Sequence, residues 1–487
     1  MNIWSRIAAR PYWPLIPFCL GVFIAADDQT VVVTLLPDLL IDLEIGANEL
    51  DRASWIITGY LIGFTAAMPF MGRTSDRIGR KFAFIAAMTI FMAGSAFVAV
   101  SVDIPIWLGG DDPSLNWTIA ARVVQAIGGG AIIPIAIAAV GDLLPAARHA
   151  VAFGIVGASA EAGGVIGPLW GGLITEFASW EWAFWLNIPF GFLAVALVLR
   201  SRADERRPVR IDWAGAVLFA LVLSLFTAGL SRSGNTDAWF FALLAGSVIS
   251  LILLIVWHLR APVPLIPRSL IRLRAFAAAN TAHFLIGGAL IIAMVTIPLM
   301  ADTVLGKSPL EGGLRLLRLT AGIPVGAIVG GLLTQRYGAR WPAITGLVLA
   351  TIGFALMSRW GLDISDPSMT IHLVITGIGF GFLISPITTA ALGPAADDDR
   401  GAASSFVTMS RMVGMTVGLA AITAWGTARF DSLVADAPAF SIDPAVQEEI
   451  SRIAANAGLE VFQAFFMAAA VLCAIALIPV WLMSRRT

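Results

Sequence analysis

Two adjacent carboxylates, Asp27 and Asp28, interrupt an apolar run of the chain in the stretch FIAADDQTVVV. The run is long enough to cross a bilayer, which needs about 20 apolar residues. A charged side chain at membrane depth costs about 2.5–3.5 kcal/mol on insertion scales, so such residues indicate a function. Burial and a neighbouring arginine act in opposite directions on the protonation of a carboxylate. We therefore expect Asp28 to exchange protons or bind a cationic substrate, and Asp27 is a second candidate.

Arg122 is the predicted partner of Asp28. At 1.5 Å per residue, Asp28 lies roughly 12 Å and Arg122 roughly 8 Å below the same predicted outer surface. The two side chains can then pair directly or through water. Asp27 is about 100° around the helix from Asp28, so the two carboxylates cannot point at one partner. Arg122 is interpreted either as a structural counter-ion or as a substrate ligand.

The remaining charges in apolar runs allow two interpretations each. Glu161 falls near the middle of a later run and is a further candidate for proton coupling. Arg411 is either a counter-ion or a substrate ligand. Arg315 and Arg318 lie one turn apart and can bind an anionic substrate. Arg315 and Asp302 can equally extend to the outer membrane interface.

The elements that must position these residues are membrane-spanning helices. The 487 residues are 58% hydrophobic and 13% charged, whereas a soluble protein carries about a quarter charged residues. We predict fourteen spans, at 14–36, 53–71, 82–102, 117–141, 149–174, 181–200, 211–231, 237–258, 275–301, 312–333, 341–360, 368–392, 402–427 and 460–483.

Basic residues predict the orientation of these spans. If the N-terminus is cytoplasmic, the inner segments hold a large excess of basic residues, among them Arg77, Lys81 and Arg206, and the outer segments hold few, such as Arg52 and Lys307. The positive-inside rule then places both termini in the cytoplasm of a multi-pass protein of the inner membrane. The longest outer segment, with ADAPAFSIDPAVQEE, is expected to form a short surface helix.

An internal repeat divides the chain into halves. The segment GRTSDRIGRK (72–81) follows the second predicted span, and GLLTQRYGAR (331–340) follows the tenth. Both lie on the predicted cytoplasmic side, so the copies run in parallel, as in the major facilitator architecture. We predict an all-α polytopic membrane protein with the major facilitator fold: six-helix bundles at 1–200 and 261–487, and two inserted transmembrane helices at 201–260.

The first copy of the repeat is the predicted conformational-switch loop, with Gly72, Asp76, Arg77, Gly79 and Arg80. Gly72 and Gly79 are expected to turn the chain between two helices. Asp76 is expected to accept hydrogen bonds from arginines or from a helix N-terminus in the neighbouring domain. The alternative interpretation is an ordinary cytoplasmic loop whose basic residues only fix the topology.

The fifth predicted helix carries small residues at a four-residue repeat. The two rows are Gly163, Gly167 and Gly171, and Gly164, Pro168 and Gly172. Such a face lets a partner backbone approach closely, and Pro168 is expected to bend the helix. We interpret this face either as plain helix packing or as part of the interface that opens and closes between the two domains.

These motifs resemble those of the major facilitator superfamily, and in particular its fourteen-helix drug:proton antiporters. GRTSDRIGRK is similar to the signature loop of the superfamily, and GGVIGPLWGG to the antiporter motif on helix five. DDQTVVVTLLP resembles the first-helix motif, with Asp28, Thr30 and Pro37 matching and Val33 in place of the usual asparagine. RVVQAIGGG is similar to the fourth-helix motif, and WEWAFWLNIPFG resembles a segment typical of the fourteen-helix group. Arg318 stands where the family usually has proline.

The resemblance implies a multidrug exporter that moves amphipathic or drug-like compounds outward in exchange for protons, as in drug resistance. An exporter of an anionic metabolite, siderophore or lipid on the same fold is the alternative, and a non-transporting sensor or scaffold is disfavoured. The sequence contains no Walker-type loop, so we do not expect transport to be driven by ATP. It also contains no residue pattern that suggests an enzyme, a cofactor or a metal site. Expected partners are a small-molecule substrate, protons and the lipid bilayer, without nucleic acid, and the functional unit is expected to be a monomer.

Overall fold

The computed structural model describes residues 12–43, 55–104, 115–201, 212–230, 232, 237–307, 309–396, 399–435, 438 and 444–483. Within these ranges every regular element is helical, which confirms the predicted all-α class. Fourteen spans in the described part of the chain are long and apolar enough to cross a membrane, in agreement with the fourteen predicted runs. Arg52, Arg206 and the side chains of Val33 and Pro37 lie outside the described residues.

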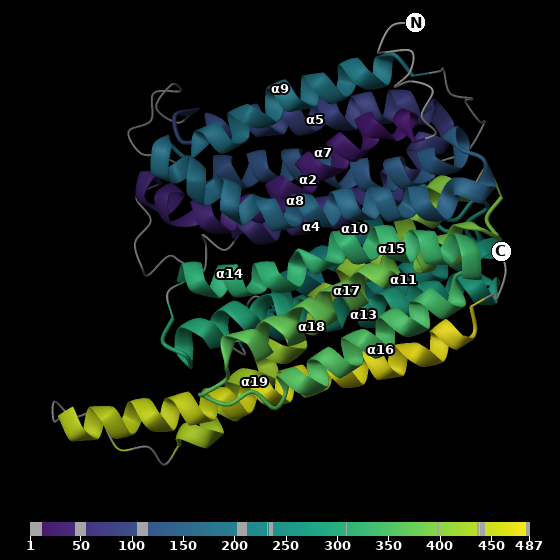
Figure 1. The fold of residues 1–487 in the computed structure, drawn as a ribbon. Coiled ribbons are helices and arrows are strands. Elements are labelled where there is room, and N and C mark those ends of the chain that lie inside the picture. The colour runs from purple at the N-terminus through teal and green to yellow at the C-terminus, as the bar shows by residue number, and fades with distance from the viewer. Residues whose placement is uncertain are drawn as a thin grey trace, which may run out of the picture. The chain divides into compact units, whose positions relative to one another are not determined.

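The chain forms two compact units. The first comprises residues 1–277 with 391–409, and the second comprises 278–390 with 410–487. The first unit contains η1 (Trp13–Leu15), α2 (Ile16–Asp42), α4 (Trp55–Ile78), α5 (Arg80–Ala99), α7 (Leu115–Leu143), η3 (Ala146–Arg148), α8 (His149–Phe177), α9 (Glu181–Leu199), α10 (Trp213–Leu230), α11 (Ala238–Arg260) and α12 (Arg268–Ile271). Its helices pack in long pairs: α2 lies along α8, and α7 packs against both α4 and α5 (Figure 1).

The helix pair predicted as an insertion, α10 and α11, groups with the first unit. α10 packs against α11 and α4. Asp212 fixes the start of this pair, because its Oδ1 accepts hydrogen bonds from Gly215 N at 2.8 Å and Trp257 Nε1 at 2.9 Å. Its Oδ2 accepts one from Leu265 N at 2.9 Å, so a single carboxylate joins α10, α11 and the segment that follows them. The domain limits at 200 and 260 stay predictions.

The second unit contains most of α13 (Arg274–Thr303) and α18 (Arg400–Val434), together with α14 (Pro309–Thr320), α15 (Gly322–Tyr337), α16 (Arg340–Met357), α17 (Asp366–Leu392) and α19 (Pro444–Trp481). α16 lies along α19. The tenth predicted span consists of two helices, α14 and α15. The longest outer segment is helical from Pro444 onward, as expected, but this helix forms the first turns of α19 and is not a separate element.

The internal repeat is confirmed at its glycines. Gly79 joins α4 to α5 with φ 92°, and Gly338 joins α15 to α16 with φ 78°. Each amide donates to the carbonyl four residues earlier, Gly79 N to Ser75 O at 3.1 Å and Gly338 N to Thr334 O at 2.9 Å. Positive φ suits glycine, since it has no Cβ. The expectation that Gly72 also turns the chain is wrong, because α4 continues through it to Ile78.

Basic side chains satisfy the last carbonyls of three helices. Lys81 Nζ donates to Leu199 O at 2.8 Å and to Ser201 O at 3.1 Å, at the end of α9. Its repeat partner Arg340 donates through Nε to Met483 O at 3.0 Å, just after α19. Arg268 Nη2 donates to three carbonyls at the end of α11, including Leu259 O at 2.7 Å. Such contacts complete helix ends whose carbonyls have no partner within the helix.

Candidate functional site

Asp28 is the centre of a buried polar network in the first unit. Its Oδ2 accepts a hydrogen bond from Arg122 Nη1 at 2.9 Å, and its Oδ1 accepts from Gln125 Nε2 at 2.7 Å and Asn187 Nδ2 at 2.8 Å. Asp28 is 0% exposed and Arg122 is 1% exposed. The predicted proximity of Asp28 and Arg122 is therefore confirmed as a direct ion pair.

Four helices supply the side chains of this network. Asp28 comes from α2, Arg122 and Gln125 lie one turn apart on α7, and Asn187 comes from α9. Ser95 on α5 closes the network, because its hydroxyl oxygen accepts from Gln125 Nε2 at 2.6 Å and from Asn187 Nδ2 at 3.2 Å. Gln125 Oε1 in turn accepts from Arg122 Nη1 at 2.6 Å. Such additional bonds help a buried ion pair to be tolerated, although Arg122 Nε has no hydrogen-bond partner in the described part of the chain.

Aromatic rings cover the arginine. The guanidinium carbon of Arg122 lies 4.0 Å from the ring centroid of Tyr60 and 5.6 Å from that of Phe184. Both rings present an electron-rich face to the cation, which is favourable in a desolvated site. The Tyr60 hydroxyl donates to Ala25 O on α2 at 3.4 Å, which ties α4 to the helix that carries Asp28. The network is thus enclosed by protein on the side of the arginine.

Asp27 lies outside this network, as predicted from its position around the helix. The residue is 8% exposed, and its Oδ1 has no hydrogen-bond partner in the described part of the chain. An isolated carboxylate is costly in apolar surroundings, so a bound proton or cation would offset that cost. The two adjacent carboxylates therefore differ in chemistry: Asp28 is fully paired, and Asp27 retains an unused acceptor.

The glycine rows of α8 have different neighbours. A Cβ added to Gly163, Gly167 or Gly171 would meet α2, at the backbone of Phe23, Asp27 and Val31 respectively. Plain helix packing is therefore confirmed for this row, and it holds the backbone of Asp27 against α8. The other row differs, because a Cβ on Gly172 would meet no described atom within 4 Å. A role of Gly164, Pro168 and Gly172 in a domain interface stays a prediction.

The other predicted site residues are spread over several helices. Glu161 is half-buried on α8, and Arg411 is half-buried on α18. Arg318 on α14 donates to Asp366 Oδ1 at 2.8 Å and to Thr370 Oγ1 at 2.7 Å, at the start of α17. Asp366 is 60% exposed, so this ion pair is near the surface.

Arg315 differs from Arg318 in its surroundings. It is half-buried on α14, and its Nε and Nη1 have no hydrogen-bond partner among the described residues. Asp302, at the end of α13, is exposed. Within the described part of the chain, Arg318 is thus joined to a carboxylate, whereas Nε and Nη1 of Arg315 have no partner.

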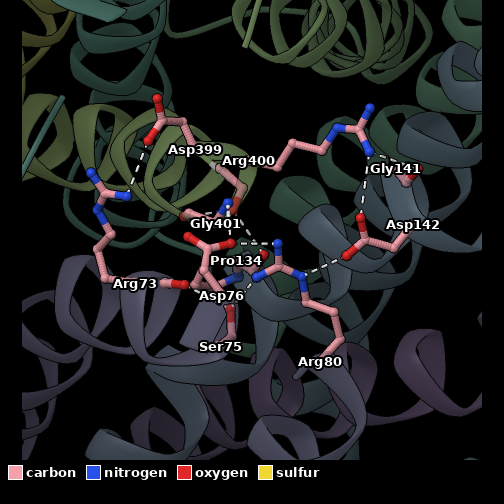
Figure 2. A network of polar contacts seen from close by, with 12 residues as sticks. Arg73, Ser75, Asp76, Arg80, Pro134, Gly141, Asp142, Asp399, Arg400 and Gly401 are labelled. Carbon is pink, nitrogen blue, oxygen red and sulfur yellow. Dashed lines mark hydrogen bonds and ion pairs between the residues drawn. The ribbon is translucent and has the colours of Figure 1, made fainter. Parts of the chain in front are cut away.

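A second polar network lies at the predicted cytoplasmic end of the first unit (Figure 2). Asp76, buried on α4, pairs with Arg80 at the start of α5. Its Oδ1 also accepts a hydrogen bond from Gly401 N at 3.1 Å, in the first turn of α18. Asp76 thus accepts bonds from an arginine and from the first turn of a helix, as expected, but Gly401 groups with the first unit and not with a neighbouring one. The role of this motif as a conformational switch stays a prediction. Arg77, in the same motif, is exposed at the end of α4.

Further ion pairs join the beginning of α18 to the first six helices. Arg73 Nη1 contacts Asp399 Oδ1 at 3.0 Å. Asp142, near the end of α7, accepts from Arg80 Nε at 2.9 Å and lies 3.4 Å from Arg400 Nη1 (Figure 2). These contacts and the Asp76–Gly401 bond are called here the inner latch. It connects residues 399–401, from the second half of the sequence, to α4, α5 and α7.

Several of these residues were missed from sequence. Gln125 and Asn187 lie inside the motifs RVVQAIGGG and WEWAFWLNIPFG, which were recognised only as whole segments. Gln125 follows Arg122 by three residues and so shares its helix face, a signal that was available. Nothing in the sequence marks Asp142 and Asp399 as members of a polar network, because a carboxylate at a helix end is usual on a protein surface.

Comparisons with known proteins agree with this architecture. The family model of the Major Facilitator Superfamily matches residues 18–270 and 279–487. A triacylglyceride transporter of Mycolicibacterium smegmatis is 34% identical over 435 residues, which cover 85% of this chain and 76% of that protein. A probable triacylglyceride transporter of Mycobacterium leprae is 32% identical over 494 residues, which cover 96% and 95%. A human organic anion transporter has a similar structure, with a TM-score of 0.65, 16% identity, and coverage of 97% of this chain and 99% of that one, which confirms the predicted fold.

Proposed function

Because this chain belongs to the major facilitator superfamily and is a multi-pass transporter, we propose that it exports an uncharged, lipid-like molecule across the cytoplasmic membrane in exchange for protons. The names of the mycobacterial relatives support a glyceride cargo over the drug-like compounds that the motif resemblance implies. In this proposal both termini are cytoplasmic, as the basic residues predict. The chain resembles the fourteen-helix drug:proton antiporters in its motifs, and it differs from them in its cargo.

The buried Asp28–Arg122 ion pair is the observation that supports proton coupling. Asp28 accepts three hydrogen bonds, all from side chains that stabilise its charged form. Protonation removes the negative charge, and a buried arginine without its counter-ion is unstable. The network must then rearrange, so a proton arriving at Asp28 changes how α2, α7 and α9 are held together. Release of that proton restores the ion pair.

Asp27 extends this mechanism. Asp27 directly precedes Asp28, on the part of α2 that packs against Gly163 and Gly167, and its Oδ1 has no partner among the described residues. A proton bound at Asp27 is the second element of the same step in this proposal, because the two carboxylates share one helix. Glu161 remains the third candidate.

The inner latch is proposed to hold the start of α18 against α4 and α7 of the first unit in one state of the cycle. Its contacts are charged or involve a helix N-terminus, and each of them can break and re-form as the start of α18 moves. The apparent strength of a latch of this kind falls with ionic strength where it is exposed. Asp76 and Arg80 are buried, so they form its salt-resistant part.

Transport into inside-out vesicles tests the proposal. We expect a fluorescent triacylglycerol, supplied on a carrier to the outer surface of the vesicles, to accumulate inside only with the chain and with an imposed pH gradient. Asp28→Asn should abolish the gradient-driven part and Ser159→Ala, a substitution on α8 outside the network, should leave it unchanged. Accumulation that does not depend on the pH gradient would overturn proton coupling. If the native chain fails to accumulate triacylglycerol, the glyceride cargo is overturned.

An anionic cargo is the second candidate, and Arg315 favours it. Two of its guanidinium nitrogens are buried and have no partner in the described part of the chain. Carboxylate and phosphate groups are the ligands that arginine binds most strongly. The same vesicle assay, run with a fatty acid in place of the triacylglycerol, distinguishes this candidate from the first.

A further inference from the structure

An apolar cavity of about 570 Å³ lies wholly within the second unit, apart from both polar networks. Its walls come from the C-terminal part of α13, the C-terminal part of α18 and the N-terminal part of α19. Cavities of this size hold small ligands or one flexible chain of a larger one. None of its lining residues carries a charge.

Small residues of α19 create the space. Ser451, Ala454, Ala455 and Gly458 line the cavity at intervals of three, one and three residues, so they share one face of the helix. The floor is aromatic, with Phe462 and Phe465 buried beneath this face. A bulky residue anywhere on the small face would fill the cavity.

The rim of the cavity is polar but uncharged. Thr303, Thr423 and Ser451 line it and are exposed, whereas the aromatic floor is buried. The Thr303 hydroxyl donates to Leu299 O at 2.8 Å, so Thr423 and Ser451 are the residues whose hydroxyls would donate to an ester carbonyl. The floor matches an apolar tail. Arg429 Nη2 and Glu460 Oε1, 2.6 Å apart, join α18 to α19 beside the cavity without lining it.

The cavity lies at the edge of the apolar part of α19. The helix has 38 residues, about 57 Å at 1.5 Å per residue, whereas a bilayer core is about 30 Å thick. Its apolar run begins near residue 460, so Ser451, Ala454 and Ala455 belong to the polar extension that precedes it. A ligand in the cavity would thus have its tail at the membrane edge and its polar group outside the hydrocarbon, on the side predicted to be external.

We propose that this cavity binds one acyl chain of an uncharged, ester-bearing cargo lipid at the outer end of the second unit. The inference rests on the proposed lipid export and adds a site of its own. The uncharged lining argues against a cationic or anionic ligand, because a charge would be buried there without a partner. The hydroxyl rim would hold the ester group, and the aromatic floor would hold the chain.

Photolabelling tests the site without any substitution. The full chain is reconstituted in phosphatidylcholine vesicles with a triacylglycerol that carries a diazirine in one acyl chain, and labelled peptides are identified by mass spectrometry after illumination. We expect labels in the peptides that contain Phe430, Phe462 and Phe465, and competition by unlabelled triacylglycerol. A matched phosphatidylcholine probe should label these peptides weakly. Equal labelling by the phospholipid probe, without competition by triacylglycerol, would overturn the cargo site and identify a site for bilayer lipid.

A pair of neighbouring substitutions completes the test. Ala455→Phe fills the cavity, and Asn456→Phe places the same ring on an exposed position of the same turn that does not line it. We expect Ala455→Phe to reduce labelling and lipid export by about tenfold, which corresponds to about 1.4 kcal/mol, and Asn456→Phe to preserve both. If the native chain exports triacylglycerol while the cavity stays unlabelled, the site is refuted and the function stands. If the native chain exports no lipid, the function itself is refuted.

Discussion

Gly72 and Gly401 leave no room for a side chain on either residue: a Cβ on Gly72 would meet the carbonyl oxygen of Gly401, and a Cβ on Gly401 would meet that of Gly72. The two glycines bring α4 and the start of α18 into backbone contact at the inner latch. This close approach is what places Gly401 N within 3.1 Å of Asp76 Oδ1.

Gly72→Ala is therefore expected to loosen the inner latch. Its added methyl group would collide with backbone, and such overpacking costs about 1–3 kcal/mol. Export should fall while membrane insertion stays normal, as measured by vesicle transport and by the amount of protein in the membrane. Gly313→Ala is the control, because a Cβ there meets no described atom within 4 Å. Equal effects of the two substitutions would show that the latch has no special role.

Asp76→Asn is expected to cut export strongly. The amide keeps an acceptor for Gly401 N but loses the charge that pairs with Arg80, and a hydrogen bond to a charged group contributes about 1.5–3 kcal/mol. Gln335, the residue at the same position of the second repeat, is exposed, so Gln335→Ala should have little effect. The comparison is made in the vesicle assay at matched expression. Similar losses from both would mean that the two loops act only as topological anchors.

Gly167→Ala and Gly172→Ala should have opposite effects on stability. A Cβ on Gly167 would meet Thr30 and the Asp27 carbonyl of α2, so we expect a loss of about 1–3 kcal/mol. A Cβ on Gly172 meets no described atom within 4 Å, and alanine favours a helix over glycine by about 1 kcal/mol. Thermal unfolding in detergent measures both. A stable Gly167→Ala variant would show that α2 and α8 can separate without cost.

Asp28→Asn should destabilise the protein as well as uncouple it. The substitution leaves Arg122 buried without a counter-ion, which costs about 3–5 kcal/mol. The double variant Asp28→Asn with Arg122→Gln removes both charges, so it should regain much of the lost stability while gradient-driven export stays absent. Unfolding in detergent and vesicle transport are measured on the same preparations. Recovery of gradient-driven export in the double variant would exclude Asp28 as the coupling residue and favour Asp27 or Glu161.

Substitutions of Arg315 and Arg318 are expected to have different effects on transport. Arg318→Gln removes a partly exposed ion pair with Asp366, and such pairs contribute about 1 kcal/mol or less. Arg315→Gln removes a half-buried guanidinium whose Nε and Nη1 have no partner among the described residues, so any transport of anions should depend on it. Uptake of a fatty acid and of a triacylglycerol is compared for both variants. If neither variant changes fatty-acid uptake, both arginines only reach the membrane interface.

Much of the architecture follows from hydropathy, because a membrane span needs a long apolar run wherever it occurs. Depth arithmetic along two antiparallel helices was sufficient to pair Asp28 with Arg122. The same arithmetic cannot place Asn187 and Ser95, which reach Asp28 from α9 and α5, because it gives depth and not the lateral neighbours of a helix. The sequence predicts that Asp76 contacts the N-terminus of a helix, but it does not identify Gly401 as the partner, since 325 positions separate the two residues.

Lys81, Arg340 and Arg268 lead to a consequence for biogenesis. Each donates to the final carbonyls of a helix, and α9, α11 and α19 all end on the side predicted to be cytoplasmic. The C-terminal end of a helix carries a partial negative charge that favours a nearby cation. The positive-inside rule favours basic residues on the cytoplasmic side, where these three helices are predicted to end. One set of charges can therefore guide the nascent chain into the membrane and later remain as part of the finished structure. Glutamine at position 81 would separate these two uses, since it can still donate a hydrogen bond and carries no charge to be read during insertion.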